Sequence, residues 1–468
     1  MDKKLKYIDI NIPAYAEIIT SKRSFTKQDI KDFVDSFKQS NLIRFTDLER
    51  YFNNKSMVDL QETTAEFIPN HKVKAASARY ITNMATSYFM GISPTWKTED
   101  EALDEIINAI TTSNVDGNYR YKIAKDCSVY GVGYGILWRD EEAHYRYSAL
   151  NPKETFIVRD ATIEKRPILA IRVVTINKDV EMIEVYDNDY KWSYTSENGN
   201  LTETIDSAGN AVLESHNMNQ LPIIEYKNNL DRTSDFEFVL NEIEAYNVSI
   251  STTANDISAF ADAYLVLTGY NDTTKADWEA ITEERVLPLD PEGKAEFITK
   301  ATNDTMQVNY RAQLLNDIHK YSQVPNLSDE TFAGNLSGVA IRFKLIGLDA
   351  LAGEKEQMMR ESMRLELEAI ANHITQRGLL SDTEIKLNSD DYVTVTFHRN
   401  LPQNEVEMAQ MLNSLQTLLS DETLIAQVPF VDDVNAEIER KRNELEEESV
   451  PTTLFTQAGE KDVEETEE

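Results

Sequence analysis

The chain has 468 residues, 41% of them hydrophobic and 27% charged, which allows two to four domains with substantial cores. No apolar run approaches the roughly eighteen residues that cross a bilayer, and the opening MDKKLKYIDI has no apolar signal-peptide core, so we expect a protein made and kept in a cytoplasm. The formal net charge of −34 argues against a protein that grips nucleic acid through its phosphates, because such proteins are basic.

The first 100 residues show helical spacing. Thr26 and Asp29 resemble a capping box, which four apolar residues follow at intervals of three and four: Ile30, Phe33, Val34 and Phe37. A second helix is predicted from Val73 to Gly91, a residue that suits a C-terminal cap. Its apolar stripe consists of Tyr80, Met84 and Tyr88.

Between Cys127 and Asn228 the period changes to short β-branched and aromatic runs separated by polar turns, which predicts antiparallel strands. The runs are SVYGVGYGILW, RYSALNP, TFIVRD, PILAIRVV, EMIEVYD and YKWSYTS. The glycines at 131, 133 and 135 lack the GxGxxG spacing and a Walker Lys-Ser/Thr. We interpret them as a bulge or a close backbone approach within a strand rather than a phosphate loop.

Residues 234–268 predict one long helix of about thirty residues, roughly 45 Å in length at 1.5 Å per residue. Ser234 and Glu237 form a capping box at its start, and no Gly or Pro follows until Gly269. Such a helix usually packs against others, often from other subunits, through its apolar stripe: Val239, Ile243, Tyr246, Ile250, Ala254, Ile257, Phe260 and Tyr264. The polar faces are expected to meet water: Asn241, Glu244, Asn247, Ser251, Asn255, Asp256 and Asp262.

A small insertion is predicted at 270–305, before a partner helix at 309–323. It should contain a short helix near 277–283 and two strand-like runs, RVLPL and AEFITK, joined by a turn at 290–293. An isolated two-stranded hairpin is barely stable in water. We therefore expect a neighbouring subunit to supply partner strands.

A helix-breaking loop at 325–337 precedes a third long helix, which we expect to bend near Gly347 and Gly353 and to end at Gly378. The remaining predicted elements are a strand at 392–397 and helices that start near Gln403, run through Leu424, and extend from Val434 to Leu445. From Glu446 onward the chain is acidic and poor in aromatic residues, which predicts disorder.

No catalytic pattern stands out. The carboxylates are spread along helices without an acid/base couple, and the six histidines form no HExxH or triad-like pattern: His71, His144, His216, His319, His373 and His398. Asp187-Asn188-Asp189 lacks the rest of a calcium loop and predicts a turn. The single cysteine, Cys127, excludes an intrachain disulfide and a thiolate metal cage, and we expect it to be a buried structural thiol. We predict no enzyme activity, no metal and no cofactor.

Four stretches carry a family resemblance through their wording and their order: 68–91 (IPNHKVKAASARYITNMATSYFMG), 221–247 (LPIIEYKNN running into SDFEFVLNEIEAYN), 255–269 (NDISAFADAYLVLTG) and 324–348 (VPNLSDETFAGNLSGVAIRFKLIGL). Together they resemble portal proteins of tailed bacteriophages, most closely those of long-tailed phages of Gram-positive hosts. The resemblance extends roughly from 68 to 445. It implies an α+β fold with a β-rich wing, a two-helix stem, a small α/β clip and a helical crown.

On that pattern the parts have definite boundaries. They are a wing at 1–233, a stem helix at 234–268, a clip at 269–306, a second stem helix at 307–323, a tunnel loop at 324–338, a wing helix and strand at 339–400, a crown at 401–445 and an acidic tail at 446–468. The independent prediction of two helices that bear a small strand-rich insertion agrees with this pattern.

The resemblance implies a twelve-subunit ring at one capsid vertex, through which double-stranded DNA is packaged and ejected. The implied partners are the large terminase, a head-completion or adaptor protein, and the major capsid and scaffolding proteins, without a membrane. The implied location is the portal vertex of the virion, with the host cytoplasm during assembly. An acidic lining would let DNA pass without binding its phosphates, although acidity for solubility is the commoner reason for such a charge.

The resemblance also assigns residues to roles. The tunnel loop would present Asn326, Leu327, Ser328, Asp329, Glu330, Phe332, Asn335, Leu336 and Ser337. The cations beside it that face phosphates, or pair with a neighbour's carboxylates, would be Lys320, Arg342 and Lys344. The stem stripe would form the subunit interface through Val239, Ile243, Tyr246, Ile250, Ile257, Phe260 and Tyr264. Terminase and adaptor would dock on the acidic clip residues Asp272, Asp277, Glu279, Glu283 and Glu284.

Three alternatives remain open at this level. The loop at 325–337 can be a plain connection whose apolar residues lie in the core. The chain can be another oligomeric virion protein, such as an adaptor or minor head protein, although adaptors are usually far shorter. An enzyme with a β-rich domain is the third alternative.

Overall fold

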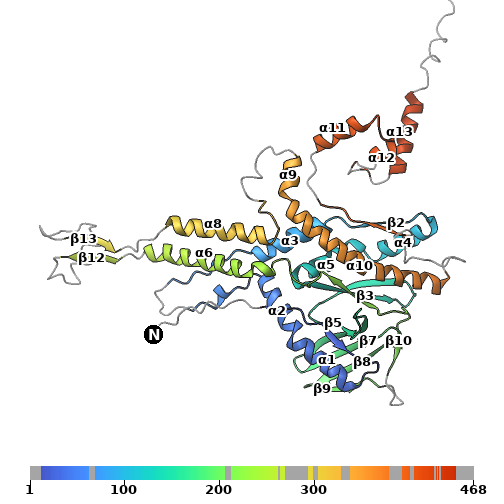
Figure 1. The fold of residues 1–468 in the computed structure, drawn as a ribbon, viewed down its shortest axis with the longest axis horizontal. Helices are drawn as coiled ribbons and strands as arrows, with labels where there is room; N and C mark the ends of the chain where they lie inside the picture. The colour runs from blue at the N-terminus through green and yellow to red at the C-terminus, as the bar shows by residue number, and fades with distance from the viewer. Residues whose placement is uncertain are drawn as a thin grey trace, which may run out of the picture. The chain divides into compact units, whose positions relative to one another are not determined.

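The computed structural model describes residues 12–62, 69–205, 212–261, 264–268, 294–298, 304–327, 338–378, 393–400, 405–425, 428, 431 and 434–448. The chain divides into two units. Unit 1 comprises Met1–Gly334 and Arg342–Asn400, and unit 2 comprises Asn335–Ile341 and Leu401–Glu468. Helices and strands both contribute heavily (Figure 1), which confirms the predicted α+β class.

The N-terminal part of unit 1 is helical, as predicted. Helices α1 (Lys27–Gln39) and α2 (Asn41–Phe52) lead to a 3₁₀ turn, η1 (Met57–Leu60). The predicted capping box is present, because the Thr26 hydroxyl accepts from the Asp29 N–H and the Asp29 carboxylate accepts from the Thr26 N–H. Helix α3 (Ser77–Met90) ends at Gly91 as predicted, but it starts at Ser77 and not at Val73, because side chains of another helix bind the backbone before it.

Two helices of this part, α4 (Glu101–Ser113) and α5 (Asp116–Tyr130), were not predicted, and α5 replaces the strand expected from Cys127. Gly131 ends α5 with φ +85° and lies so close to the Arg232 carbonyl that a Cβ would overlap with it. The strand therefore begins only at Val132. Cys127 is buried in α5, where burial raises the pKa of its thiol, so the prediction of a buried thiol is confirmed.

Two sheets follow. The larger sheet has the order β1-β5-β6-β7-β8-β10, with β9 paired to β8, and β1 pairs with β5 in parallel while the other pairs are antiparallel. Its strands are β1 (Ile18–Thr20), β5 (Thr155–Asp160), β6 (Pro167–Asn177), β7 (Val180–Tyr186), β8 (Tyr190–Glu197), β9 (Asn200–Glu203) and β10 (Glu214–Ser215). The smaller sheet has the order β11 (Ile223–Lys227), β3 (Val132–Arg139), β4 (Tyr145–Leu150). The glycines at 133 and 135 lie inside β3, which confirms that they belong to a strand.

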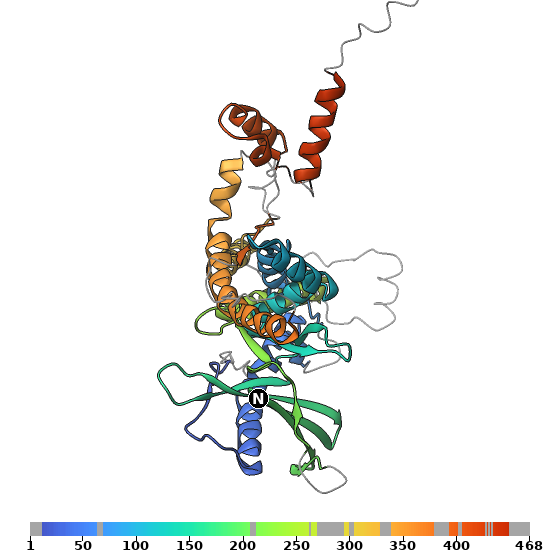
Figure 2. The ribbon, with the colours of Figure 1, turned by 90° about the vertical axis from the view of Figure 1, so that its right-hand side faces the viewer.

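The main core of unit 1 lies between the larger sheet and the first two helices (Figures 1 and 2). Phe37 of α1 stacks on Phe156 of β5 with ring centroids 4.6 Å apart, and Phe45 of α2 packs beside Phe37. All three rings are buried. Offset aromatic contacts of this kind add specificity to the burial of apolar surface.

The helix pair of unit 1 differs from the prediction at its far end. A short turn, η2 (Glu237–Val239), precedes α6 (Leu240–Ala261), and α6 lies against α8 (Asp304–Tyr321). The single helix expected to reach Gly269 is wrong, because 264–268 forms strand β12 (Tyr264–Thr268). It pairs antiparallel with β13 (Lys294–Ile298), so the predicted AEFITK strand is found with a different partner (Figure 1). The RVLPL run and the helix near 277–283 lie outside the described residues.

The third long helix is interrupted once. Helix α9 (Gly338–Lys344) is followed by α10 (Ile346–Arg377), and Gly378 caps α10 in the left-handed region. The predicted bend thus falls at Leu345, beside Gly347, whereas Gly353 lies inside a continuous helix. The predicted strand at 392–397 appears as β14 (Thr394–Thr396), which pairs with β2 (Thr95–Lys97).

Unit 2 contains α11 (Glu405–Leu415), α12 (Asp421–Ile425) and α13 (Val434–Glu448), close to the predicted positions. Lys441 of α13 pairs with Asp421 of α12 at 2.9 Å. Helix α13 extends past the expected start of the disordered tail at Glu446, and the rest of that prediction lies outside the described residues. In the part of the chain that the structure describes, no helix is long and apolar enough to cross a membrane.

Buried ion pairs hold helix α10 to the rest of unit 1. Glu366 accepts from Arg120 of α5 at 2.5 Å and from the Tyr119 hydroxyl at 2.8 Å, and all three side chains are buried. About three turns toward the start of α10, Lys355 pairs with Asp235 at 2.7 Å. A buried ion pair is costly to break, because the remaining charge stays desolvated without its partner.

This contact predicts a large stability difference between two glutamates of α10. Replacing Glu366 with Leu leaves Arg120 with Asp116 as its remaining carboxylate partner and should lower the free energy of unfolding by about 3 kcal/mol. Glu361→Leu is the matched control, because Glu361 is exposed and pairs with Lys227 at 3.2 Å, a contact worth about 0–1 kcal/mol. Denaturant unfolding of both variants measures the difference, and equal losses would contradict the role of the buried pair.

Candidate functional site

The apolar stripe predicted along the first long helix splits into an inner and an outer part. Val239 and Ile243 are buried within the chain, so the prediction that they face another subunit is wrong. Tyr246 and Ile250 are half-buried, whereas Ile257 is 66% exposed. The structure does not describe the side chains of Phe260 and Tyr264. The half of α6 nearer the sheets thus packs inside the subunit, and Ile257 remains on the surface of the other half.

Helix α8 shows the same division. Leu314 and Ile318, near its C-terminal end, are buried, whereas Met306, Val308 and Tyr310 near its N-terminal end are exposed. Met306 is 68% exposed and Tyr310 is 49% exposed. The described ends of α6 and α8 nearer β12 and β13 therefore carry a group of exposed apolar side chains. Met306 and Tyr310 lie one turn apart on the same side of α8, whereas Val308, two residues from each, lies on the opposite side. We call three of these residues the outer apolar face: Ile257, Met306 and Tyr310.

A polar stripe on α6 was expected to meet water, and that prediction is wrong for three of its residues, whereas Asn241 is exposed as predicted. Glu244, Asn247 and Ser251 are buried. The Asn247 amide oxygen accepts from the Ala75 N–H at 2.8 Å, and Glu244 accepts from the Met57 N–H at 2.8 Å. Burial raises the pKa of the Glu244 carboxyl, against the Met57 hydrogen bond, which lowers it.

His71 lies in the segment 69–76 that leads into α3, and residues of this stripe contact three of its atoms. Its N–H donates to the Asn255 amide oxygen at 2.6 Å, its carbonyl accepts from the Ser251 hydroxyl, and its ring Nε2 lies 2.6 Å from the Ser258 hydroxyl. Five residues of α6 contact either His71 or the backbone N–H of Met57 or Ala75. We call them the α6 polar stripe: Glu244, Asn247, Ser251, Asn255 and Ser258. Their spacing of three and four was visible in the sequence, but nothing in it showed that they bind a backbone.

The predicted tunnel loop is described only at its start. Asn326 is half-buried and Leu327 is partly exposed, directly after the end of α8. Seven further predicted loop residues lie outside the described residues: Ser328, Asp329, Glu330, Phe332, Asn335, Leu336 and Ser337. Their part in a channel stays a prediction.

The three predicted cations lie on two helices. Lys320 is exposed on α8, with its amine 5.3 Å from the ring of Tyr321. Arg342 is exposed on α9, and Lys344 is half-buried. The predicted docking residues of the clip lie outside the described residues: Asp272, Asp277, Glu279, Glu283 and Glu284.

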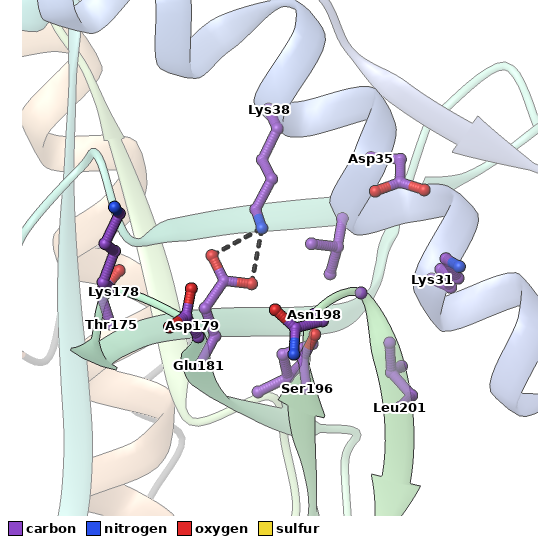
Figure 3. Close-up of a pocket in the computed structure, with 13 residues that line it drawn as sticks. Lys31, Asp35, Lys38, Thr175, Lys178, Asp179, Glu181, Ser196, Asn198 and Leu201 are labelled. Atoms are coloured by element: carbon purple, nitrogen blue, oxygen red, sulfur yellow. Dashed lines mark hydrogen bonds and ion pairs between the residues drawn. The ribbon is translucent and has the colours of Figure 1, made fainter.

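A cavity of about 260 Å³ lies between α1 and the turns of the larger sheet (Figure 3). The Lys38 amine points at the Glu181 carboxylate at 2.6 Å, as the dashed lines in Figure 3 show. The residues that line the cavity include neither histidine nor cysteine. Lys38 and Glu181 form an ion pair that joins α1 to β7 across the cavity.

Two acidic turns also have structural explanations. The Asp187 carboxylate accepts from the N–H groups of Asp189 and Tyr190, which confirms the predicted turn. Asp140 lies near Glu142 and His144, but its carboxylate already accepts from Arg146 at 2.8 Å and from the His144 N–H at 2.7 Å. Neither turn points to catalysis.

Comparison with known proteins gives a consistent result. A family model described as phage portal protein, SPP1 Gp6-like, matches residues 31–450. The portal protein of Bacillus phage SPP1 is 23% identical over 416 residues, which cover 85% of this chain and 81% of that protein. The portal protein of the Clostridium phage phiCD119 is 23% identical over 374 residues, which cover 72% of this chain and 77% of that protein.

The α6 polar stripe predicts a local effect of a single amide. Asn247→Ala removes the acceptor for the Ala75 N–H and should cost about 1 kcal/mol, because that part-buried N–H loses its hydrogen-bond partner. Hydrogen exchange of peptides covering 69–76 should speed up accordingly. Thr252→Ala, at an exposed position of the same helix, is the control and should leave those peptides unchanged. Similar exchange in the two variants would contradict the assigned role of Asn247.

Proposed function

Because this chain belongs to the SPP1 Gp6-like family of phage portal proteins, we propose that it forms a ring-shaped channel at one capsid vertex for the packaging and ejection of double-stranded DNA. Proteins of this family are structural, and their general function is that of a DNA-packaging channel. The observation that carries the proposal is the family match over 31–450 together with the α6–α8 pair that bears β12 and β13. A helix pair with a small strand ribbon is what a portal stem and clip require.

We assign the parts of the subunit as the sequence suggested: a wing at 1–233 and 339–400, a stem formed by α6 and α8, a clip at 269–306 and a crown at 401–445. Two observations support this assignment. The sheets and α10 belong to unit 1, as wing elements should, and the crown residues belong to unit 2. The stem is modified in one respect, since β12 takes the place of its predicted last helical turns.

The outer apolar face is the subunit interface that we propose for the stem. A closed ring needs heterologous contacts, in which one face of each subunit meets a different face of the next. Ile257, Met306 and Tyr310 are large, exposed and near one end of the helix pair, where burial in a neighbour would gain about 25 cal/mol per Å² of apolar area. Tyr246 and Ile250 adjoin this surface. The two-stranded β12–β13 ribbon would gain further pairing from neighbouring subunits.

The charge of the chain suits a channel that conducts DNA without holding it. With a net charge of −34 per subunit, a ring repels phosphates on average. We propose that the tunnel loop approaches the duplex and that the few cations beside it, Lys320, Arg342 and Lys344, contact phosphates or a neighbour's carboxylates. Strong phosphate binding would slow the passage of DNA, because each contact releases counterions and adds affinity.

The proposed partners follow from the same role. The large terminase and the head-completion protein would dock on the acidic clip residues, and the wing and crown would meet capsid and scaffolding proteins. The proposed stoichiometry is twelve subunits. The protein would be located at the portal vertex of the virion after assembly in the host cytoplasm.

The ring itself is the first test. Purified chain should form particles of several hundred kilodaltons with a central hole in negative-stain images. Introducing a buried charge with Ile257→Asp should lower the fraction of chains in rings at least tenfold, since an unpaired desolvated charge costs several kcal/mol. Ile163→Asp, at a fully exposed position of the β5–β6 turn, is the control and should form rings normally. Normal rings in both variants would refute the proposed interface.

The tunnel loop gives a second test. Deleting 326–334 should leave ring formation intact, because these residues are proposed to face the channel and not a neighbour. The fraction of capsids that contain and retain DNA should fall, which the DNA content of purified particles measures. If the deletion abolishes rings, the loop is a structural element and the proposal for it fails.

A further inference from the structure

The segment between α8 and α10 starts and finishes at one place in unit 1. Gln323 turns the chain at the end of α8 with φ +59°, in the left-handed region. A Cβ on Gly347, in the first turn of α10, would lie 3.3 Å from the Gln323 carbonyl oxygen. The glycine thus permits α10 to approach the end of α8 closely. Both ends of the intervening chain are therefore fixed near each other.

Tyr80 of α3 holds the first residues of this segment by two hydrogen bonds. Its hydroxyl donates to the Pro325 carbonyl at 2.9 Å and accepts from the Leu327 N–H at 3.0 Å. Proline has no N–H of its own, so its carbonyl is the group that Pro325 offers to a partner. The phenol group binds on both sides of Asn326 and fixes the direction of the chain there.

His319 of α8 completes the arrangement. Its Nδ1–H donates to the Val324 carbonyl at 2.9 Å, and its ring packs edge-on against the Tyr80 ring, with centroids 5.6 Å apart and planes at 89°. Val324 is buried. Two side chains from two helices thus bind Val324, Pro325 and Leu327. We call Tyr80 and His319 the clasp.

Helix α3 is itself held from both ends, so Tyr80 is a fixed point. The α6 polar stripe binds the segment that leads into α3. Near the other end, the Tyr88 backbone carbonyl accepts from the Asn400 N–H at 3.1 Å. The clasp therefore ties the segment after α8 to a helix that contacts both α6 and α10.

We propose that Tyr80 is a positioning residue for DNA passage: with His319 it fixes the point and direction in which the chain leaves α8, so that the tunnel loop starts from the same place in every subunit. The inference rests on the proposed function, because identical loop starts matter when copies surround one axis. All three hydrogen bonds of the clasp go to backbone groups, so they do not depend on the side chains of the loop that follows.

The test compares two tyrosines of the same helix. Tyr80→Phe keeps the ring on His319 and removes both hydrogen bonds, whereas Tyr88→Phe removes one hydrogen bond to α10 and serves as the matched control. In assembled rings, Tyr80→Phe should speed hydrogen exchange at Leu327 about tenfold, the factor that corresponds to one lost hydrogen bond. Peptides from α6 and the sheets should be unchanged, and the fraction of DNA-filled capsids should fall several-fold.

A second pair of variants tests the clasp should Tyr80→Phe disturb folding. His319→Phe removes the donor to Val324 and keeps an aromatic ring beside Tyr80, so it should also speed exchange at 324–327 and lower the filled fraction. His319→Asn places an amide N–H near the position of Nδ1–H and should restore both values toward those of the unchanged protein. If the His319 ring acted only through packing, His319→Phe would behave like the unchanged protein, and His319→Asn would show the faster exchange and the lower filled fraction.

The outcomes separate the clasp from the proposed function. Unchanged exchange at 324–327 in Tyr80→Phe would overturn the clasp, and faster exchange with normally filled capsids would overturn its role in DNA passage. Equal effects of Tyr80→Phe and Tyr88→Phe on the filled fraction would overturn it too. If capsids with the unchanged protein as their portal never fill, the proposed function itself fails, and the inference falls with it.

Discussion

Backbone amides that leave water need new partners, and for the segment that leads into α3 these partners are side chains of another helix. Residues 69–76 lie outside any helix or strand, and their backbone groups at His71 and Ala75 bind the α6 polar stripe. This constraint fixes where α3 begins and how α6 meets the rest of unit 1. The position of Tyr80, and with it the start of the tunnel loop, follows from the same contact.

Buried charged side chains of unit 1 form pairs, whereas the excess of negative charge lies on other residues. The buried cations of unit 1 bind carboxylates from distant parts of the sequence: Arg44 pairs with Glu237 at 2.5 Å, Arg120 with Glu366, and Lys355 with Asp235. These pairs join α2 to η2, α5 to α10, and α10 to the residue two positions before η2. Pairs of opposite sign contribute nothing to the net charge, so the acidic excess falls on other residues. Subunits of this charge repel each other, and apolar contacts must outweigh that repulsion in a ring.

Local sequence signals predicted the elements that depend on local interactions. The Thr26–Asp29 capping box, the Gly91 and Gly378 ends and the helix at 309–323 are all found, because caps and helical spacing act within a few residues. Helix α5 was missed since it is buried on most of its faces, including Arg120 and Asp126, and so shows no single apolar stripe. A fully enclosed helix with charged residues resembles neither an amphipathic helix nor a strand.

Long-range contacts account for the other differences. Residues 264–268 continue the apolar spacing of a helix but also suit a strand, and pairing with β13 decides the outcome. The same applies to the site. The sequence showed which residues of α6 are polar, but their partners lie 172 or more positions away, as for Asn247 and Ala75. Tyr80 carried no sequence signal for its role, because a tyrosine within an apolar stripe is typical of ordinary packing. The sequence also placed the exposed apolar surface of the stem too near the wing, because Val239 and Ile243 are buried within their own subunit.

The enclosed thiol of Cys127 has a practical consequence. It is the only sulfhydryl in the chain, and burial keeps it protonated at neutral pH and inaccessible to alkylating reagents. A cysteine introduced at an exposed site of α8 would therefore be the sole reactive one, and would carry a single fluorophore, spin label or cross-linker per copy without removal of the natural residue.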